Sequence, residues 1–487
     1  MRTPHRTLLG LATALAVGLA LHAAHAWAAP ADRLAAALDR ALADPALKGA
    51  QVGALVVEVR SGRVRFARQP DTRFVPASTL KLVTAAAALL RLGPEYAWLT
   101  PILGDGALED GVLAGDLYVR GSGDPSLVAE QVFRLAATVR AAGVTRVEGR
   151  VVADGSLFPP EGEPSGWALY DGPEAYRPII GAASFNFNAV EVTVQPGAAG
   201  SPPVVTLEPL TSYIRVDNRA TTGPAGTPYA LAVGAALSDP ADPDSTVLLV
   251  SGTLPEDAPA RRVVRRVEGP ARYLATAVRD ALVGVGVDVR GGIGEGPTPG
   301  SAVPLAVHRS RALGAVLADM GKFSNNFMAE MVLRTLGVEA TGGPAGSAAG
   351  LAVLRDVLRE AGADPAEAVL VDGSGLSRLN LLSPSDLVAV LLAMERRFDS
   401  RAEFAAGFGL LGVDGTVQRR YADSPAARRV RAKTGSLNGV RTLAGYAEGP
   451  RGELLAFVLF ANNLLAPIDR VAAAERRFVE ALTGSAR

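Results

Sequence analysis

The stretch Phe74-Val75-Pro76-Ala77-Ser78-Thr79-Leu80-Lys81 opens an alanine- and leucine-rich run that stops at Gly93-Pro94. Pro76 stands just before the run, Ser78 can cap a helix and Gly-Pro can end one. The pattern therefore predicts a buried helix that begins at Ser78. Residues three apart on a helix share one face, so we expect Ser78 and Lys81 to lie one turn apart. The rest of the chain is expected to serve this pair.

The chemistry expected of the pair follows from its position. A serine at a helix N-terminus lies beside free backbone N–H groups and the positive end of the helix dipole. A lysine one turn further on, held among apolar residues, is desolvated, which lowers its pKa. A neutral amine can take the proton of a nearby hydroxyl and so activate a serine without histidine. The pattern predicts Ser78 as a nucleophile and Lys81 as its base.

Cysteine and histidine usage limits the other options. The sequence has no cysteine and four histidines, and only His308 lies beyond residue 28. This excludes a disulfide, a Cys-His dyad and a histidine-rich zinc site, and we expect neither a metal nor an organic cofactor. A Ser-His-Asp triad would need His308. We interpret this residue as a strand-end histidine, because it follows an apolar segment and precedes Arg309.

Lysine is rare in this chain. Of 49 basic residues only Lys48, Lys81, Lys322 and Lys433 are lysine. A surviving lysine can mark a position that needs a compact amine able to lose its proton, which arginine cannot do. Lys48 has no such context, and Lys322 is interpreted as structural, with a place in the cleft wall as the alternative.

Two further motifs complete the candidate site. Lys433-Thr434-Gly435-Ser436 follows a β-like run, and a lysine with a hydroxyl at a strand edge suits a substrate carboxylate. Ser-x-Asn occurs as Ser184-Phe185-Asn186, Ser324-Asn325-Asn326 and Ser436-Leu437-Asn438. We favour the motif at Ser324, because a loop between two helices can reach over a cleft.

Residues 1–28 have the features of a secretory signal. Arg2 and Arg6 precede an apolar run, and Ala26-Trp27-Ala28 offers a small-x-small cleavage site. The formal net charge is +0, without charge runs, so no nucleic-acid partner is expected. Beyond the signal, no apolar run is long enough for a transmembrane segment. The prediction is an exported, soluble protein of the periplasm.

The 487 residues exceed one ordinary domain. Residues 29–99 and 305–487 carry helical periodicity and strand candidates, whereas 100–304 consist of short β-like runs separated by Gly, Pro and Asp. We predict one catalytic domain from the two outer segments and a β-rich insertion, made of two subdomains, from 100–304. The Gly- and Pro-rich stretch 291–304 is expected to be a return linker.

Together these motifs resemble those of the serine D-alanyl-D-alanine peptidases among the class C low-molecular-mass penicillin-binding proteins. The long interval between the first two motifs distinguishes this family from β-lactamases. One departure from the wider superfamily is asparagine, not aspartate, at position 325. The resemblance rests on the following stretches: Pro76–Lys81, Leu92–Tyr96, Gly121–Leu127, Ser184–Asn188, Ser324–Asn326 followed by Ala329 and Glu330, Asp372–Arg378, Gly412–Thr416, Lys433–Leu437 and Leu443–Tyr446.

The resemblance implies an α/β (α+β) fold. Its core would be a β-lactamase/DD-transpeptidase-like domain, an antiparallel sheet flanked by helices, with large β-rich inserted subdomains. The implied activity is D-Ala-D-Ala carboxypeptidase, endopeptidase on D-Ala-diamino-acid cross-links, or both. Peptidoglycan stem peptides would be the substrates, and β-lactam antibiotics would be covalent inhibitors.

The resemblance also implies a role for each catalytic residue. Ser78 would form the acyl-enzyme, Lys81 would accept its proton, and Ser324 would relay the proton to the leaving amine. The oxyanion hole would consist of the backbone N–H groups of Ser78 and Ser436.

The implied substrate-binding residues are Asn326, Lys433, Thr434, Gly435 and Ser436. Asn326 would bind the peptide backbone of the substrate, and Thr434, beside Gly435, would bind its terminal carboxylate. The positive charge of Lys433 would lower the Lys81 pKa.

Two alternatives stay open. The first is a β-lactamase or esterase on the same fold, which the long insertion argues against and rapid turnover of penicillin would favour. The second is an inactive wall-binding sensor, which would be expected to lack one of the motif residues. Ser374 and Ser377 are either part of the active-site wall or turn residues, and the turn interpretation is favoured.

Overall fold

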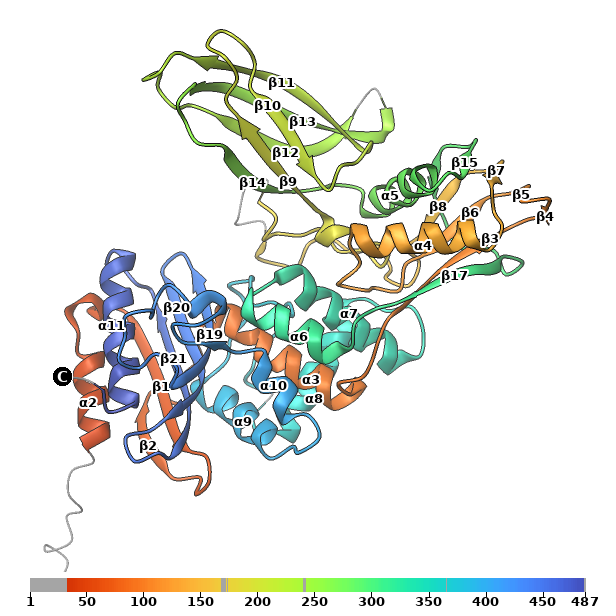
Figure 1. Ribbon diagram of the computed structural model, residues 1–487. Helices are drawn as coiled ribbons and strands as arrows, with labels where there is room; N and C mark the ends of the chain where they lie inside the picture. Colours follow the sequence, from red (N-terminus) through yellow and green to blue (C-terminus); the bar gives the residue numbers. More distant parts are fainter. Residues whose placement is uncertain (1–32, 168–171, 173, 240–241, 365, 486–487) are drawn as a thin grey trace, which may run out of the picture.

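The structure is a computed structural model that describes residues 33–167, 172, 174–239, 242–364 and 366–485. The predicted signal, 1–28, lies outside the described residues. Figure 1 shows the two ends of the chain gathered in one body around a sheet, while the middle of the chain, which carries the labels β3 to β17, forms a second body. None of the helices in the described ranges has both the length and the apolarity needed to cross a membrane.

The first body contains a six-stranded sheet that combines both ends of the chain. Its order is β18-β19-β20-β21-β1-β2, and every neighbouring pair is antiparallel. The pairing of β1 with β21 sets Ala54 opposite Leu459, so the ends of the chain fold as one unit. The strands are β1 (Gln51–Glu58), β2 (Val64–Arg68), β18 (Gly409–Leu410), β19 (Val430–Leu437), β20 (Val440–Glu448) and β21 (Leu454–Asn462).

Helices cover both faces of this sheet. On β1, Ala54 and Val56 belong to the core beneath α2 and α11, whereas Leu55 and Val57 belong to the core shared with the other helices. Side chains alternate along a strand, so a nearly continuous apolar run buries both faces. The helices are α2 (Arg33–Leu42), α3 (Lys81–Leu92), α6 (Leu313–Lys322), α7 (Asn326–Thr341), α8 (Ser347–Glu360), α9 (Pro384–Glu395), α10 (Arg401–Ala406) and α11 (Ile468–Leu482).

The middle of the chain forms a β-rich body with an apolar core of its own, drawn from residues between Ile102 and Ala306. Its helices are α4 (Ala129–Ala141) and α5 (Pro270–Gly284). Its strands are β3 (Leu99–Gly104), β4 (Leu108–Glu109), β5 (Val112–Leu113), β6 (Leu117–Arg120), β7 (Arg146–Val147), β8 (Val151–Asp154), β9 (Ala189–Gln195), β10 (Val204–Glu208), β11 (Ile214–Gly223), β12 (Ala232–Asp239), β13 (Asp242–Pro255), β14 (Arg261–Arg266), β15 (Asp288–Val289), β16 (Ile293–Glu295) and β17 (Val303–Arg309).

These strands form four sheets, with the orders β16-β8-β6-β3-β17, β15-β7-β5-β4, β10-β9-β14 and β11-β13-β12. The predicted linker 291–304 is wrong in part, because β16 and the start of β17 lie within it. Pro304 suggested a break in the sequence, but β17 is an edge strand, where a missing N–H is tolerated. The predicted limits of the two domains stay a prediction.

The helix after Pro76 begins later than the sequence predicted. Residues Ala77–Leu80 form a 3₁₀ turn, η2, and α3 begins only at Lys81. Ser78 therefore lies inside the turn, and no side chain caps it. The predicted end is confirmed, because α3 stops at Leu92 and Gly93 follows with φ 80°.

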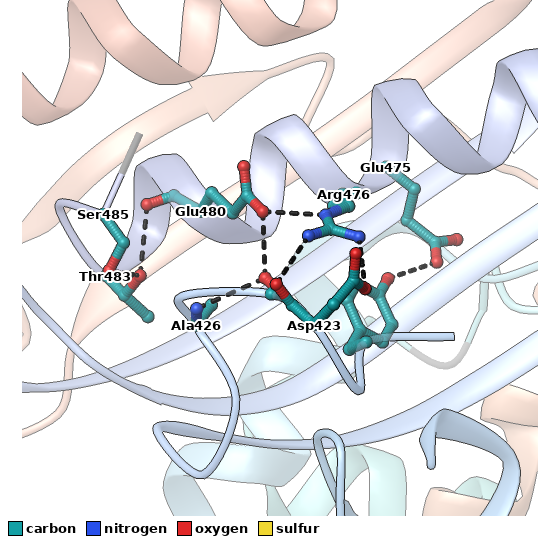
Figure 2. A network of polar contacts seen from close by, with 9 residues as sticks. Asp423, Ala426, Glu475, Arg476, Glu480, Thr483 and Ser485 are labelled. Atoms are coloured by element: carbon teal, nitrogen blue, oxygen red, sulfur yellow. Dashed lines mark hydrogen bonds and ion pairs between the residues drawn. The ribbon is translucent and has the colours of Figure 1, made fainter. Parts of the chain in front are cut away.

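A polar network fixes α11 to the segment around Asp423, as Figure 2 shows. Arg476 donates to Asp423 Oδ1 at 2.8 Å and to Glu480 Oε1 at 2.8 Å. The residue before Arg476, Glu475, is buried and accepts from Arg441 Nε at 2.7 Å, on strand β20. Because Arg441 lies inside the sheet, Glu475 connects the helix to the sheet through a desolvated ion pair.

We predict that Glu475→Ala destabilises the protein by about 3–5 kcal/mol, because removing one member of a buried pair leaves the other charge uncompensated. Urea unfolding followed by circular dichroism measures the change. The control is Glu480→Ala on the same helix, whose partner Arg476 is 30% exposed. That variant should lose no more than about 1 kcal/mol. Equal losses of unfolding free energy in the two variants would contradict a special role of the buried pair between Glu475 and Arg441.

Candidate active site

The 3₁₀ turn η2 holds Ser78 against the sheet. Its backbone is anchored from β20, where Thr442 Oγ1 donates to Pro76 O at 2.8 Å. Within the turn, Thr79 Oγ1 donates to the same carbonyl at 2.6 Å. Lys81 follows as the first residue of α3 and is 1% exposed, whereas Ser78 remains partly exposed. The turn thus presents the hydroxyl to solvent and buries the amine behind it.

Among the residues that the structure describes, the Lys81 amine has three polar contacts, and none of them is a carboxylate. It lies 3.1 Å from Ser78 Oγ, 2.7 Å from Asn326 Oδ1 and 2.7 Å from the Ser374 carbonyl oxygen. A neutral amine has two N–H donors and one lone pair. Donation to Asn326 and Ser374 uses both donors and leaves the lone pair for the hydroxyl proton of Ser78.

Burial lowers the pKa of Lys81 from its ordinary value to about 7. The charges that act on it are those of Asp372 and Glu330, and both raise the pKa against the effect of burial. The sequence analysis named burial and the positive charge of Lys433 as causes. Burial is the largest cause, whereas the charges felt by Lys81 are carboxylates.

A second buried lysine lies on the other side of the site. Lys433 Nζ lies 2.9 Å from Ser324 Oγ and 2.7 Å from the Thr434 carbonyl oxygen. Burial first, and the charge of Lys81 second, hold the pKa of Lys433 well below its ordinary value. Ser324 has φ 57°, a conformation that serine rarely adopts, in the short turn between α6 and α7. This backbone directs its hydroxyl toward Lys433.

The two asparagines of the Ser-Asn-Asn motif have different roles, because one caps a helix and the other contacts Lys81. Asn325 is the N-cap of α7, and its Oδ1 accepts from Met328 N at 3.0 Å. Asparagine and aspartate cap helices about equally well, which accounts for asparagine here. Asn326 contacts Lys81 through Oδ1 and donates through Nδ2 to the Tyr176 carbonyl at 2.6 Å. A residue of the inserted region thus fixes the amide that orients the base.

The Lys-Thr-Gly segment lies inside β19 rather than at the end of a strand, because β19 continues to Leu437. Thr434 Oγ1 lies 2.7 Å from Thr416 Oγ1. Sequence reasoning gave Thr416 no role, although Gly412–Thr416 contributed to the resemblance. Ser436, exposed, follows Gly435 along the same strand. The segment therefore places the hydroxyls of Thr434 and Ser436 beside the turn that carries Ser78.

The loop that begins at Asp372 forms the third wall of the active site. It contains Ser374 and Ser377, which we interpreted from the sequence as turn residues. The Ser374 carbonyl contacts Lys81, so the turn residue also belongs to the site. Asp372, which begins the loop, accepts from the indole Nε1 of Trp167 at 2.8 Å. Ser377 Oγ donates to the Ser165 carbonyl at 2.6 Å. Two contacts thus join the loop to the inserted region.

Asp372 and Glu330 are the residues near the base that sequence reasoning missed. Both belong to stretches that carried the resemblance, but nothing in the local sequence showed that both lie near Lys81. They are 42 residues apart in the sequence, so only tertiary folding places them there.

The other residues considered from sequence lie elsewhere. His308 lies next to last in β17, as expected of a strand-end histidine, with Nε2 3.6 Å from Asp124 Oδ2. Lys322 forms an ion pair with Asp414 at 2.6 Å, which favours the structural interpretation. In the part of the chain that the structure describes, no group of three or more His, Cys, Asp or Glu side chains is arranged to hold a metal ion.

Comparison with known proteins gives consistent matches. The sequence profile of the D-Ala-D-Ala carboxypeptidase 3 (S13) family matches residues 34–481. Over 475 residues the chain is 36% identical to a D-alanyl-D-alanine carboxypeptidase of Actinomadura sp. (strain R39), covering 95% of this chain and 85% of the relative.

Solved structures extend the comparison to the fold. Penicillin-binding protein 4 of Haemophilus influenzae matches with a TM-score of 0.78 and 26% identity, covering 90% of this chain and 97% of its own. A complex of that protein with a β-lactam matches with a TM-score of 0.73 and 26% identity, covering 91% and 97%. These matches confirm the fold class expected from the sequence.

We predict that Gly435→Ala lowers the rate of penicillin acylation at least about tenfold without unfolding the protein. A Cβ on Gly435 would lie 2.1 Å from Thr442 Oγ1 and 2.9 Å from Ser78 N, so β19 and the turn must separate. Labelling with a fluorescent penicillin measures the rate, and circular dichroism reports folding.

Gly284→Ala on α5 is the control, since its Cβ would meet no atom within 4 Å. If a folded Gly435→Ala protein acylates as fast as this control, the close approach of β19 to the turn is unimportant.

Proposed function

The chain belongs to the D-Ala-D-Ala carboxypeptidase 3 (S13) family and is a serine-type D-Ala-D-Ala carboxypeptidase, and we propose that Ser78 is its nucleophile and Lys81 its general base. The proposed substrates are the stem peptides of peptidoglycan, reached after export of the protein to the periplasm. The observation that carries the assignment is the buried Lys81 amine, 3.1 Å from Ser78 Oγ, with its two donors engaged elsewhere.

In the acylation step, Ser78 Oγ attacks the carbonyl carbon between the two terminal D-alanines. Lys81 takes the hydroxyl proton as the new C–O bond forms, and a pKa of about 7 leaves much of the amine neutral near neutral pH. The C–N bond then breaks, and the leaving D-alanine needs a proton on its nitrogen. The product is an ester between Ser78 and the shortened stem peptide.

Ser324 is the proposed proton relay to the leaving nitrogen. Its hydroxyl lies 2.9 Å from Lys433 Nζ. Ser324 can therefore give its proton to the leaving amine and regain a proton from Lys81 by way of Lys433. The lowered pKa of Lys433 suits this exchange, because a lysine with its ordinary pKa holds its proton too firmly. Water later cleaves the ester with the same base, and the two products leave.

The edge of β19 is the proposed binding site for the substrate backbone. β18 pairs with Ala432 and Arg431, and within the described ranges no further strand pairs with that side of β19 from Lys433 onward. An extended peptide can add there as a further strand. Thr434 would bind the terminal carboxylate, supported by Thr416, and Asn326 would bind the peptide from the opposite wall. Backbone N–H groups of Ser78 and Ser436 would form the oxyanion hole.

A β-lactam offers a strained amide to the same nucleophile, so we propose that penicillins acylate Ser78 and inhibit the enzyme. The β-lactam complex of the Haemophilus influenzae protein supports this proposal. Cleavage of a cross-link between D-alanine and a diamino acid is the same reaction with a different leaving amine. Endopeptidase activity is therefore proposed as the second activity of this site.

We predict that Lys81→Arg loses at least about a hundredfold in both penicillin acylation and release of D-alanine from a pentapeptide muropeptide. The guanidinium keeps its proton at neutral pH, and general-base catalysis contributes roughly 10²–10⁴-fold. Ser78→Ala should show neither activity. Acylation is measured as a second-order rate, and the muropeptide products are separated by chromatography.

A folded Lys81→Arg enzyme that acylates within a few-fold of the wild type would show that the base lies elsewhere. Persistent labelling of Ser78→Ala would remove the nucleophile. The same digestion with cross-linked dimers decides the second activity, since an enzyme limited to carboxypeptidase action leaves the dimers intact.

A further inference from the structure

Two carboxyl groups are buried beside the base without contacting it directly. Glu330 lies on α7 and is 2% exposed, and Asp372 begins the third wall and is 0% exposed. Glu330 follows Asn326 by four residues, so both face the same side of α7, toward Lys81. Two ionised carboxylates in one buried site repel each other strongly. The hydrogen bonds around each group show which of them carries the charge.

Asp372 is surrounded by N–H donors. Its Oδ1 accepts from Gly375 N at 2.7 Å and from Asn380 Nδ2 at 2.9 Å. Its Oδ2 accepts from Ser377 N at 2.7 Å and from Trp167 Nε1 at 2.8 Å. Each oxygen thus faces two donors, and a carboxyl proton would meet a donor in any of these directions. The arrangement fits an ionised carboxylate.

Glu330 has a different environment. One backbone donor, Gly373 N, lies 3.0 Å from Oε1 and 3.3 Å from Oε2, and the Ser374 side chain is a second hydrogen-bond partner. A serine hydroxyl accepts as well as donates, so it can receive a carboxyl proton. A buried group with one N–H donor and one hydroxyl partner fits the neutral acid.

We propose that Glu330 carries a proton at neutral pH and is a positioning residue that fixes the Ser374 carbonyl against Lys81. Its acceptor oxygen holds Gly373 N, and its O–H group donates to the Ser374 hydroxyl. From α3, Thr84 Oγ1 donates to Gly373 O at 2.6 Å, in the peptide group that joins Gly373 to Ser374. Gly373 is thereby held at both its N–H and its carbonyl, directly before the residue whose carbonyl orients the base.

The proton on Glu330 also keeps Lys81 able to act as a base. Burial, and then the charge of Asp372, raise the pKa of Glu330 to about 8, against the hydrogen bonds with Ser374 and Gly373 and the charge of Lys81, which lower it. An ionised Glu330 would hold a proton on Lys81, because a nearby negative charge raises the pKa of the amine. A neutral Glu330 leaves the lone pair of Lys81 free for Ser78. This inference rests on the proposed role of Lys81 as base.

The test compares Glu330→Gln with Glu330→Ala in the full-length protein. Glutamine keeps a carbonyl acceptor and an N–H donor, so it reproduces the neutral acid. Alanine leaves Gly373 N without a partner in a buried site. The glutamine variant should acylate with penicillin at least about tenfold faster than the alanine variant. Glu339→Gln, an exposed position on the same helix that accepts from Tyr96, is the matched control and should behave as wild type.

Infrared spectroscopy at neutral pH gives a second measurement, which would not change if Glu330 had only a structural role. The wild type should show the carbonyl band of a protonated carboxyl group, and Glu330→Gln should lack it while Glu339→Gln retains it. The result that overturns the proposal is absence of this band from the wild type, or equal losses of acylation in the glutamine and alanine variants. A wild type that fails to acylate at all contradicts the proposed function instead, while the band still reports on Glu330.

Discussion

The desolvation of one amine is the constraint on which the site depends. Lys81 is buried at the start of α3, and its contacts are a hydroxyl, an amide oxygen and a carbonyl. A carboxylate in contact would pair with the amine and keep it protonated. Because these contacting groups are uncharged, burial lowers the pKa of Lys81 to about 7. Much of the surrounding fold supplies these contacts and excludes water.

The fold assembles the site from distant parts of the chain. β20 anchors the turn that carries Ser78, α7 supplies Asn326, and β19 supplies Lys433. The inserted region contributes as well, because Trp167 holds Asp372 and the Tyr176 carbonyl holds the amide of Asn326. The insertion is therefore part of the machinery that orients the base, because both of these contacts end on residues of the site.

The sequence predicted the parts of the site that depend on local spacing. Ser78 and Lys81 are three residues apart, and their contact follows from helical geometry whether the turn is α or 3₁₀. The start of the helix was wrong, because Ser78 lies in a 3₁₀ turn that no side chain caps. The end at Gly93 was correct, since a glycine with positive φ is a local requirement.

The carboxyl groups beside Lys81 were beyond sequence reasoning. Glu330 lies in an apolar stretch of α7 and Asp372 in a glycine-rich loop, and only tertiary folding brings them together. A negative charge on either group opposes the effect of burial on Lys81, so the pKa of the base is a balance that spacing alone does not reveal. The same holds for Thr416, whose contact with Thr434 depends on how a loop packs against β19.

The most direct test of the central claim is the pKa of Lys81 itself. The chain has four lysines, so nuclear magnetic resonance of protein labelled only in lysine gives few side-chain signals, and Lys81→Arg identifies the one in the site. A titration of that signal near pH 7 is the result the account predicts. A signal that titrates near 10.4, as an exposed lysine does, would contradict it.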